Sequence, residues 1–162
     1  MSPSNREIRI QIDSRLEFID MIQQATEDVC RAALFGRETV FNISLAVREA
    51  VINAIRHGNR LASEKQVHVV FRLDGDKLTV TVRDEGEGFD FEQLRDPREP
   101  DNLFKPTGRG LFFIRSFVDR VAFSRVNGGG TEILMEKRIE RRGRRGRPVR
   151  ANQKASEGGG VR

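Results

Sequence analysis

Apolar residues alternate or recur along the chain at spacings that predict strands and helices. Alternation over residues 8–12 predicts a short edge strand. Apolar residues then recur at helical spacing after Asp13 or Ser14, either of which can cap a helix. This stripe consists of Leu16, Phe18, Ile19, Ile22, Val29 and Ala33. Gly36 is expected to end this first helix.

A second helix is predicted over residues 39–56, where apolar residues recur at three- and four-residue spacing. The apolar positions are Val40, Ile43, Val47, Ala50, Val51, Ala54 and Ile55. The helix is expected to stop at residues 57–59. Two alternating runs, 67–71 and 78–82, then flank a turn at 74–76, which predicts a β-hairpin.

The second half of the chain begins with residues 84–110, which are rich in glycine, charge and proline. This stretch is too long for a passive connection in a compact domain. A third helix is predicted over 111–118, followed by strands at 121–125 and 133–139. The whole pattern predicts an α+β fold: a two-layer α/β sandwich with helices packed on one face of a mixed, mostly antiparallel sheet.

Composition narrows the class of protein. A chain of 162 residues fits one domain of ordinary size. No apolar run approaches the roughly 20 residues needed to span a bilayer, and residues 1–15 are too polar for a secretory signal. The single cysteine, Cys30, cannot form an internal disulfide. We therefore expect a soluble cytoplasmic protein that does not associate with membranes.

Charge divides the chain into a body and a tail. Residues 137–162 hold ten Lys/Arg and two Asp/Glu, a net of +8, whereas residues 1–136 hold nineteen and twenty-two, a net of −3; together they give +5. We predict one folded domain over 1–139 and a disordered basic, Arg/Gly-rich tail over 140–162, because the tail has no apolar period. The tail is either a solubilising extension or a contact for nucleic acid or an acidic partner; no aromatic interleaving or motif supports nucleic acid.

The first candidate site lies on the second predicted helix. Glu49 and Asn53 are four residues apart, which places them on one helical face, and His57 continues the same row. A carboxylate and an amide oxygen placed in this way can activate a hydroxyl and ligate Mg²⁺. The same spacing occurs on solvated helix faces, but the rest of this helix is apolar enough to be buried.

The second candidate site follows the hairpin directly. Gly86 and Gly88 permit positive φ and a close approach of a ligand to the backbone. Asp84, at the end of a strand, can accept a hydrogen bond from an exocyclic amine such as that of adenine. An acidic surface turn has the same composition, so the motif by itself leaves both interpretations open.

The third candidate site opens the third predicted helix with Thr107, Gly108, Arg109 and Gly110. Free N–H groups at a helix start bind anions such as phosphate, and Arg109 can add charge-assisted hydrogen bonds. A glycine-rich helix start without a ligand has the same sequence. The chain has no Walker-type loop and no Rossmann fingerprint after a strand, which leaves those two nucleotide sites unsupported.

Taken in order, these motifs resemble those of the GHKL (Bergerat-fold) ATPases. Residues 49–59 resemble the N box, 84–88 and 108–110 the two glycine boxes, and Gly130-Thr131 the closing Gly-Thr. Within this superfamily the chain is most similar to the anti-sigma factor serine kinases. The Glu-Ala-x-x-Asn-Ala-x-x-His-Gly run and the short Asp-Glu-Gly-x-Gly box are typical of that branch. The resemblance covers roughly residues 8–138 and leaves the tail outside.

The resemblance implies a Bergerat ATPase fold and an ATP site. Asn53 would ligate the Mg²⁺ that bridges the ATP phosphates, and Glu49 would orient or deprotonate the attacking hydroxyl. Asp84 would bond the adenine amine, with Gly88 beside the base and Thr131 supporting the contact through its hydroxyl.

The resemblance also implies a lid and partners. Residues 92–107 would form the ATP lid, and residues 108–110 would hold phosphate. The chain would pass the γ-phosphate to a serine of a STAS-type anti-anti-sigma protein, and would sequester a sigma factor when free of that antagonist. The exposed face of the first helix and the lid are the expected partner surfaces, and a homodimer is compatible with this role.

Three alternatives are weighed against the kinase. Histidine-kinase catalytic domains usually carry Asn where Glu49 stands, and they need a helix pair for which residues 14–57 are too short. Gyrase-type ATPases need a transducer domain, for which 162 residues leave no room. A nucleotide-dependent regulatory binding module without kinase activity would keep Asp84 and Gly88 but make Glu49 dispensable. We favour the kinase, because Glu49 stands where the chemistry requires a carboxylate.

Overall fold

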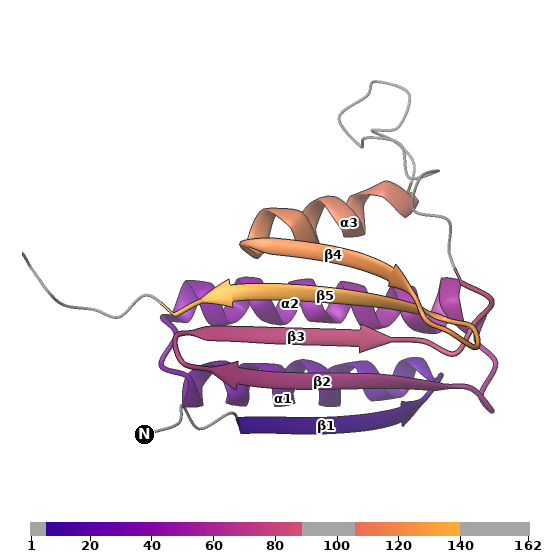
Figure 1. Cartoon of the computed structure of the whole chain (residues 1–162), viewed down its shortest axis with the longest axis horizontal. Coiled ribbons are helices and arrows are strands. Elements are labelled where there is room, and N and C mark those ends of the chain that lie inside the picture. Colours follow the sequence, from indigo (N-terminus) through magenta and orange to yellow (C-terminus); the bar gives the residue numbers. More distant parts are fainter. Residues whose placement is uncertain (1–5, 89–105, 140–162) are drawn as a thin grey trace, which may run out of the picture.

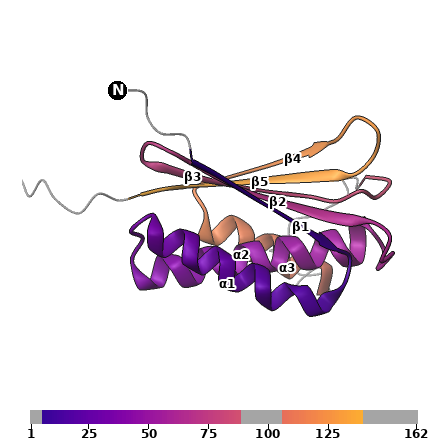
Figure 2. The same ribbon diagram turned by 90° about the horizontal axis from the view of Figure 1, so that it is seen from below.

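Within residues 6–88 and 106–139, a five-stranded sheet carries three helices on one of its faces (Figures 1 and 2). The computed structural model describes residues 6–88 and 110–139 in full and residues 106–109 as backbone only. The sheet has the order β1-β2-β3-β5-β4. Its strands are β1 (Arg6–Asp13), β2 (Gln66–Asp74), β3 (Lys77–Arg83), β4 (Arg120–Arg125) and β5 (Thr131–Arg138). Within these ranges every pairing is antiparallel, so the two-layer α+β sandwich is confirmed with an antiparallel rather than a mixed sheet.

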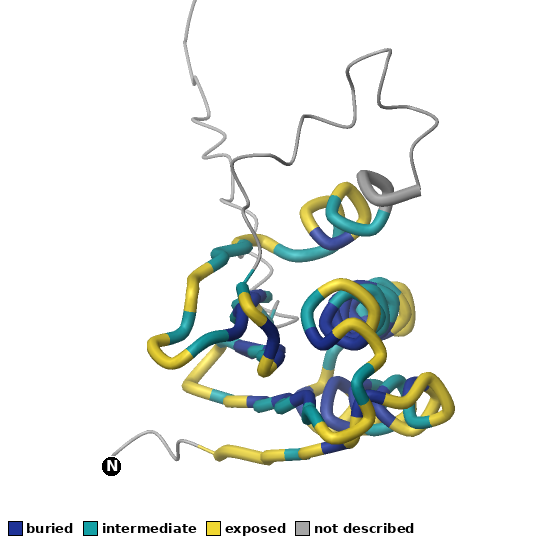
Figure 3. Tube along the Cα trace, turned by 90° about the vertical axis from the view of Figure 1, so that its right-hand side faces the viewer, coloured by how far each residue is buried: buried dark blue, intermediate teal, exposed yellow. Residues whose placement is uncertain are grey.

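The helical layer is built around its central helix. Its elements are η1 (Leu16–Phe18), α1 (Ile19–Ala32), α2 (Arg37–Asn53), η2 (Ala54–Gly58) and α3 (Pro106–Phe117). Helix α2 packs against both α1 and α3, and its apolar face is buried against the sheet (Figures 2 and 3). This core includes Ile43, Val47, Val51 and Ile55 from the helical layer and Val69, Phe71, Val80 and Val82 from the sheet. Full burial of each such side chain contributes about 1.5–3 kcal/mol relative to exposure, which fixes α2 against the strands.

Two predicted boundaries of the first helix are wrong. The hydroxyl of Ser14 donates to the carbonyl oxygen of Lys65 at 2.7 Å, so Ser14 ties the end of β1 to the start of β2 and does not cap a helix. Helix α1 ends at Ala32, and Leu34 takes the left-handed conformation with φ 66° that was expected of a glycine. Gly36 instead stands at the start of α2. At Ser14 a tertiary contact overrides the local signal, whereas the end of α1 is closed locally, by hydrogen bonds such as that from the Phe35 N–H to the Cys30 carbonyl oxygen at 3.1 Å.

The C-terminal end of α2 widens into the π-helical turn η2. The N–H of Asn59 donates to the carbonyl oxygen of Ala54 at 2.8 Å, five residues earlier. Four residues no longer complete a turn in this geometry, so His57 does not continue the row of Glu49 and Asn53. His57 is exposed, whereas the two side chains of that row are half-buried. Widened turns of this kind occur frequently at functional sites.

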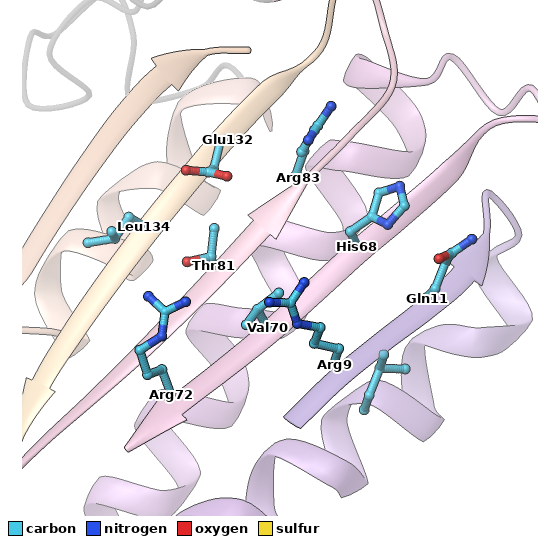
Figure 4. Close-up of a pocket in the computed structure, with 10 residues that line it drawn as sticks. Arg9, Gln11, His68, Val70, Arg72, Thr81, Arg83, Glu132 and Leu134 are labelled. Atoms are coloured by element: carbon cyan, nitrogen blue, oxygen red, sulfur yellow. The ribbon is translucent and has the colours of Figure 1, made fainter. Parts of the chain in front are cut away.

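The sheet face opposite the helices carries a cavity of about 540 Å³ (Figure 4). Its lining comes from β1, β2, β3 and β5 and includes three arginines, Arg9, Arg72 and Arg83. Glu7 forms ion pairs with Arg9 and Arg72, the latter at 2.7 Å, which offsets part of this positive charge. In the described part of the chain, no helix is long and apolar enough to span a membrane.

Candidate functional site

Helices α2 and α3 bring three of the predicted site residues together. A Cβ atom on Gly110 would lie 2.8 Å from Glu49 Oε2 and 3.5 Å from Asn53 Nδ2. The α3 backbone therefore lies directly against the two polar side chains of α2. Any residue other than glycine would press on the Glu49 carboxylate. Glu49 and Asn53 of the predicted helical row thus lie beside Gly110 of the second predicted glycine box.

The Asp84 carboxyl is held at the end of β3 by backbone groups. Asp84 is only 4% exposed. Its Oδ1 accepts hydrogen bonds from the N–H groups of Gly86 at 2.9 Å and Thr131 at 3.2 Å. Burial raises the pKa of Asp84, and those two N–H groups oppose the rise. The predicted strand-end carboxylate is therefore buried in one orientation, with Gly86 and Thr131 beside it.

Glycines surround this carboxyl at positions that tolerate no side chain. A Cβ atom on Gly58 would collide with the Asp84 carboxyl, and one on Gly130 would collide with the Asp84 carbonyl. Gly130 also has φ +98°, a conformation that favours glycine. Gly88 has φ +89° and lies near Arg125 rather than against Asp84. The wall around the carboxyl is thus made of backbone atoms.

The two groups of residues are connected through η2. Asn53 ends α2, and Gly58, which abuts Asp84, ends the widened turn that follows. Asn53 and the Asp84 carboxyl are therefore about one helical turn apart at the C-terminal end of the helix, and Glu49 lies one further turn back. An acceptor for an amine at one end and hard oxygen donors at the other fit an extended ligand with a nitrogenous base and a metal-bound polyanion.

The helix that carries the predicted phosphate site begins about one turn earlier than the sequence indicated. Helix α3 starts at Pro106, so Thr107, Gly108 and Arg109 form its first turn instead of preceding it. Proline suits this position, because it has no N–H to satisfy and its φ is that of a helix. The N–H groups of the next residues have no partner within the helix and point toward its N-terminal end. Residues 92–105 of the predicted lid and the tail 140–162 lie outside the described residues.

Two neighbouring residues have structural roles that sequence reasoning did not assign. Gly58 contacts the Asp84 carboxyl, and the side chain of Asn59 is fully buried. Both belong to the motif that was recognised, but only Glu49, Asn53 and His57 were given roles within it. The sequence feature that could have indicated these roles is the polar Asn59 directly after Gly58, a glycine at the end of a predicted helix.

The outer cavity is separate from this cluster. In the part of the chain that the structure describes, none of the predicted site residues lines it. Both neighbours of Asp84 in the chain connect to the cavity: Arg83 lines it, and the carboxylate of Glu85 lies 2.9 Å from Nε2 of the lining residue His68. The predicted site therefore lies on the helical side of the sheet, not in the outer cavity.

The family follows from a comparison with known domains. A family profile described as the histidine kinase-like ATPase domain matches residues 12–137. The chain belongs to this family. As a histidine kinase-like ATPase domain it is a nucleotide-using domain, and the match spans all the described candidate site residues, from Glu49 to Thr131.

Individual relatives place this ATPase domain close to one branch. It is 26% identical over 138 residues to the serine-protein kinase RsbW of Oceanobacillus iheyensis, covering 82% of this chain and 86% of the relative. It is 26% identical over 149 residues to the RsbW of Listeria monocytogenes, covering 86% and 95%. These matches confirm the resemblance to the serine kinase branch.

A solved structure confirms the fold. The RsbU and RsbW domains of a Mycobacterium tuberculosis protein align with a TM-score of 0.61 at 18% identity. The alignment covers 83% of this chain and 32% of that longer chain. At this identity the likeness concerns the arrangement of helices and strands, and it agrees with the predicted Bergerat ATPase fold.

Proposed function

We propose that this chain is an ATP-dependent protein-serine kinase and anti-sigma factor of a bacterial partner-switching system, acting in the cytoplasm. One observation supports this most: Asn53 and the buried Asp84 carboxyl lie at the two ends of one widened helical turn, and Glu49 stands one helical turn before Asn53. The similarity to proteins named serine-protein kinase RsbW supports the same reaction class.

The base of ATP would bind at Asp84. Oδ1 of Asp84 already accepts hydrogen bonds from the N–H groups of Gly86 and Thr131. The other oxygen of the Asp84 carboxylate is therefore the acceptor for the adenine amine. The hydroxyl of Thr131 and the backbone at Gly88 would border the base. Because Asp84 is buried, this single contact would discriminate strongly between purines that have and lack the amine.

The phosphates would bind between α2 and α3. Asn53 would hold Mg²⁺ through its amide oxygen, and the ion, when bound, neutralises phosphate charge. The first-turn N–H groups of Thr107 and Gly108, with Arg109 and the closely packed Gly110, would hold phosphate oxygens. His57 would contact the nucleotide from the exposed side of η2.

Glu49 would act on the serine hydroxyl of the protein substrate. The carboxylate accepts the hydroxyl proton while the serine oxygen forms a bond to the γ-phosphorus. The bond from that phosphorus to the bridging oxygen breaks, and ADP leaves with the electron pair. Since phosphoryl transfer depends mainly on positioning and charge neutralisation, these few groups suffice.

The protein substrate would be a STAS-type anti-anti-sigma protein, and the second partner a sigma factor. The exposed face of α1 carries charged residues of both signs, including Asp20, Asp28 and Arg31, and would contact these partners together with the lid. A homodimer is part of the proposal.

The direct test combines the purified full chain with labelled ATP, Mg²⁺ and the STAS protein encoded nearest to it. A labelled serine on the STAS protein is expected, and Glu49→Gln should slow its labelling by about 10²- to 10⁴-fold while ATP still binds. If ATP binds but no serine is labelled, and Glu49→Gln leaves sigma-factor output unchanged, the chain is a regulatory binding module and the kinase proposal is wrong.

A further inference from the structure

Asn59 is a fully buried polar residue whose side chain joins three separate segments. Its exposed fraction is 0%. The amide Nδ2 donates to Ser14 Oγ at 2.7 Å and to the carbonyl oxygen of Gln66 at 2.9 Å. Its Oδ1 accepts from the N–H of Glu85 at 2.8 Å. These bonds link the segment after β1, the start of β2 and the loop after β3.

The third bond holds the peptide that follows Asp84. The N–H of Glu85 belongs to the peptide unit that joins it to Asp84, so the acceptor on Asn59 fixes the orientation of that unit. The Glu85 carboxylate is held in turn by the N–H of Gln66 at 2.9 Å. The backbone on the C-terminal side of Asp84 is therefore anchored to β2 through two routes.

Asn59 also controls the opposite side of the same carboxyl. It directly follows Gly58, whose Cα abuts the Asp84 carboxyl and whose carbonyl oxygen abuts Gly86. The hydrogen bond from Asn59 to Gln66 of β2 thus keeps Gly58 against the Asp84 carboxyl. The Asn59 Oδ1 holds the peptide that joins Asp84 to Glu85. One amide side chain thus restrains the Asp84 carboxyl from the side of Gly58 and from the side of Glu85.

We propose that Asn59 is a positioning residue for nucleotide-base selectivity. It acts through Asp84 and does not touch the nucleotide. This inference rests on the proposed contact between Asp84 and the adenine amine. Without the Oδ1 acceptor, the part-buried N–H of Glu85 has to find another partner. The peptide then rotates, and the Asp84 carboxylate no longer points at the amine.

The test measures how the full chain distinguishes ATP from inosine triphosphate, a purine nucleotide without the amine. Titration calorimetry with Mg²⁺ gives both dissociation constants. For the wild type we expect a preference for ATP of at least about tenfold. Asn59→Ala should reduce that preference to less than about threefold, mainly by weakening ATP binding.

Two controls separate positioning from general stability. Ser14→Ala removes a partner of the Asn59 amide but leaves the bond to Glu85, and Thr26→Ala removes the buried bond from Thr26 Oγ1 to the Ile22 carbonyl on α1. Both should lower the melting temperature and keep the wild-type preference for ATP. If Asn59→Ala does not fold, Asn59→Ser, whose hydroxyl is too short to reach the Glu85 N–H, takes its place.

The outcomes are distinguishable. A folded Asn59→Ala or Asn59→Ser variant with the wild-type ATP preference overturns the inference. The same holds if Thr26→Ala loses the preference as fully as the Asn59 variants do. If the wild type shows no preference, or if Asp84→Asn leaves it unchanged, the adenine contact in the proposed function fails and the inference fails with it.

Discussion

The carboxylate of Glu49 lies directly against the backbone of Gly110, with Oε2 only 2.8 Å from the position that a Cβ atom would occupy. This contact joins α2 to the first turns of α3 and leaves no room for a side chain between them. The proposed base and the proposed phosphate-binding turn are therefore held at a fixed separation. In the proposed mechanism, transfer of the γ-phosphate depends on that separation.

Gly110→Ala tests this contact. The added methyl should displace the Glu49 carboxylate and lower the serine phosphorylation rate by about 100-fold. Stability should change little or rise, because alanine is favoured over glycine in a helix by about 1 kcal/mol. The measurements are the rate of label transfer and the melting temperature. Gly36→Ala is the control, since nothing lies within 4 Å of its Cβ position; an equal rate loss there would contradict the argument.

Glu49→Gln should separate chemistry from binding. Removing the proposed general base should slow phosphoryl transfer by about 10²- to 10⁴-fold. The dissociation constant of ATP should stay within about threefold of the wild-type value, because the contacts to the adenine ring and to the metal ion remain. Glu38→Gln, an exposed glutamate in the first turn of the same helix, should alter neither quantity. A Glu49→Gln variant with a normal transfer rate would remove Glu49 from the mechanism.

Asp84→Asn should raise the stability of the fold and weaken the binding of ATP. Burial raises the pKa of Asp84 above its ordinary value of 3.8, so the folded chain holds this proton more tightly than the unfolded chain. The free energy of unfolding therefore falls as pH rises from 3.8 through the raised pKa, and the loss persists at neutral pH. Asparagine does not ionise, so the melting temperature of Asp84→Asn should rise relative to that of the wild type across this pH range. Above the range the difference between the two should stay constant.

The same variant should bind ATP at least about tenfold more weakly, because the amide presents an NH₂ donor to the adenine amine in place of a carboxylate acceptor. Melting temperatures between about pH 4 and pH 8, together with ATP titrations, check both halves of this prediction. Lower stability than the wild type at neutral pH would show that the ionised carboxyl is net stabilising where it sits.

Cys30 should be unreactive in the folded protein. The thiol is fully buried, and burial raises its pKa to about 12. Because the thiolate is the reactive form, alkylation near pH 8 should follow the rate of unfolding, and denaturant should restore ordinary thiol reactivity. Fast labelling of the native protein would instead mean that α1 opens locally from the core.

The sequence predicted the framework of the fold well, for a physical reason that is local. Alternation in the hairpin and apolar spacing along α2 arise from one face of each element being buried, so they are visible in the order of residues alone. The same holds for the presence of Glu49 and Asn53 on one helical face. His57 departed from the row because the widened turn after Asn53 depends on packing rather than on local spacing.

The candidate site was predicted in part. Asp84 was recognised by its position after a strand and by the neighbouring glycines, but no pattern indicated that Gly58 abuts its carboxyl. Asp13 or Ser14 was expected to cap a helix, and the Ser14 hydroxyl suits that role locally. In the fold it bonds to Lys65 and accepts from Asn59, partners 51 and 45 residues away.

The amino-acid sequence by itself therefore determined the order of strands and helices, the burial of their apolar faces and the identity of the residues that we propose to bind a nucleotide. These properties depend on periodicity and on side-chain chemistry. Only the tertiary structure decided that Gly110 meets Glu49, that Gly58 and Gly130 enclose Asp84, and that Asn59 joins three segments. Such contacts arise from the packing of elements far apart in the chain, and the packing selects among partners that are locally equivalent.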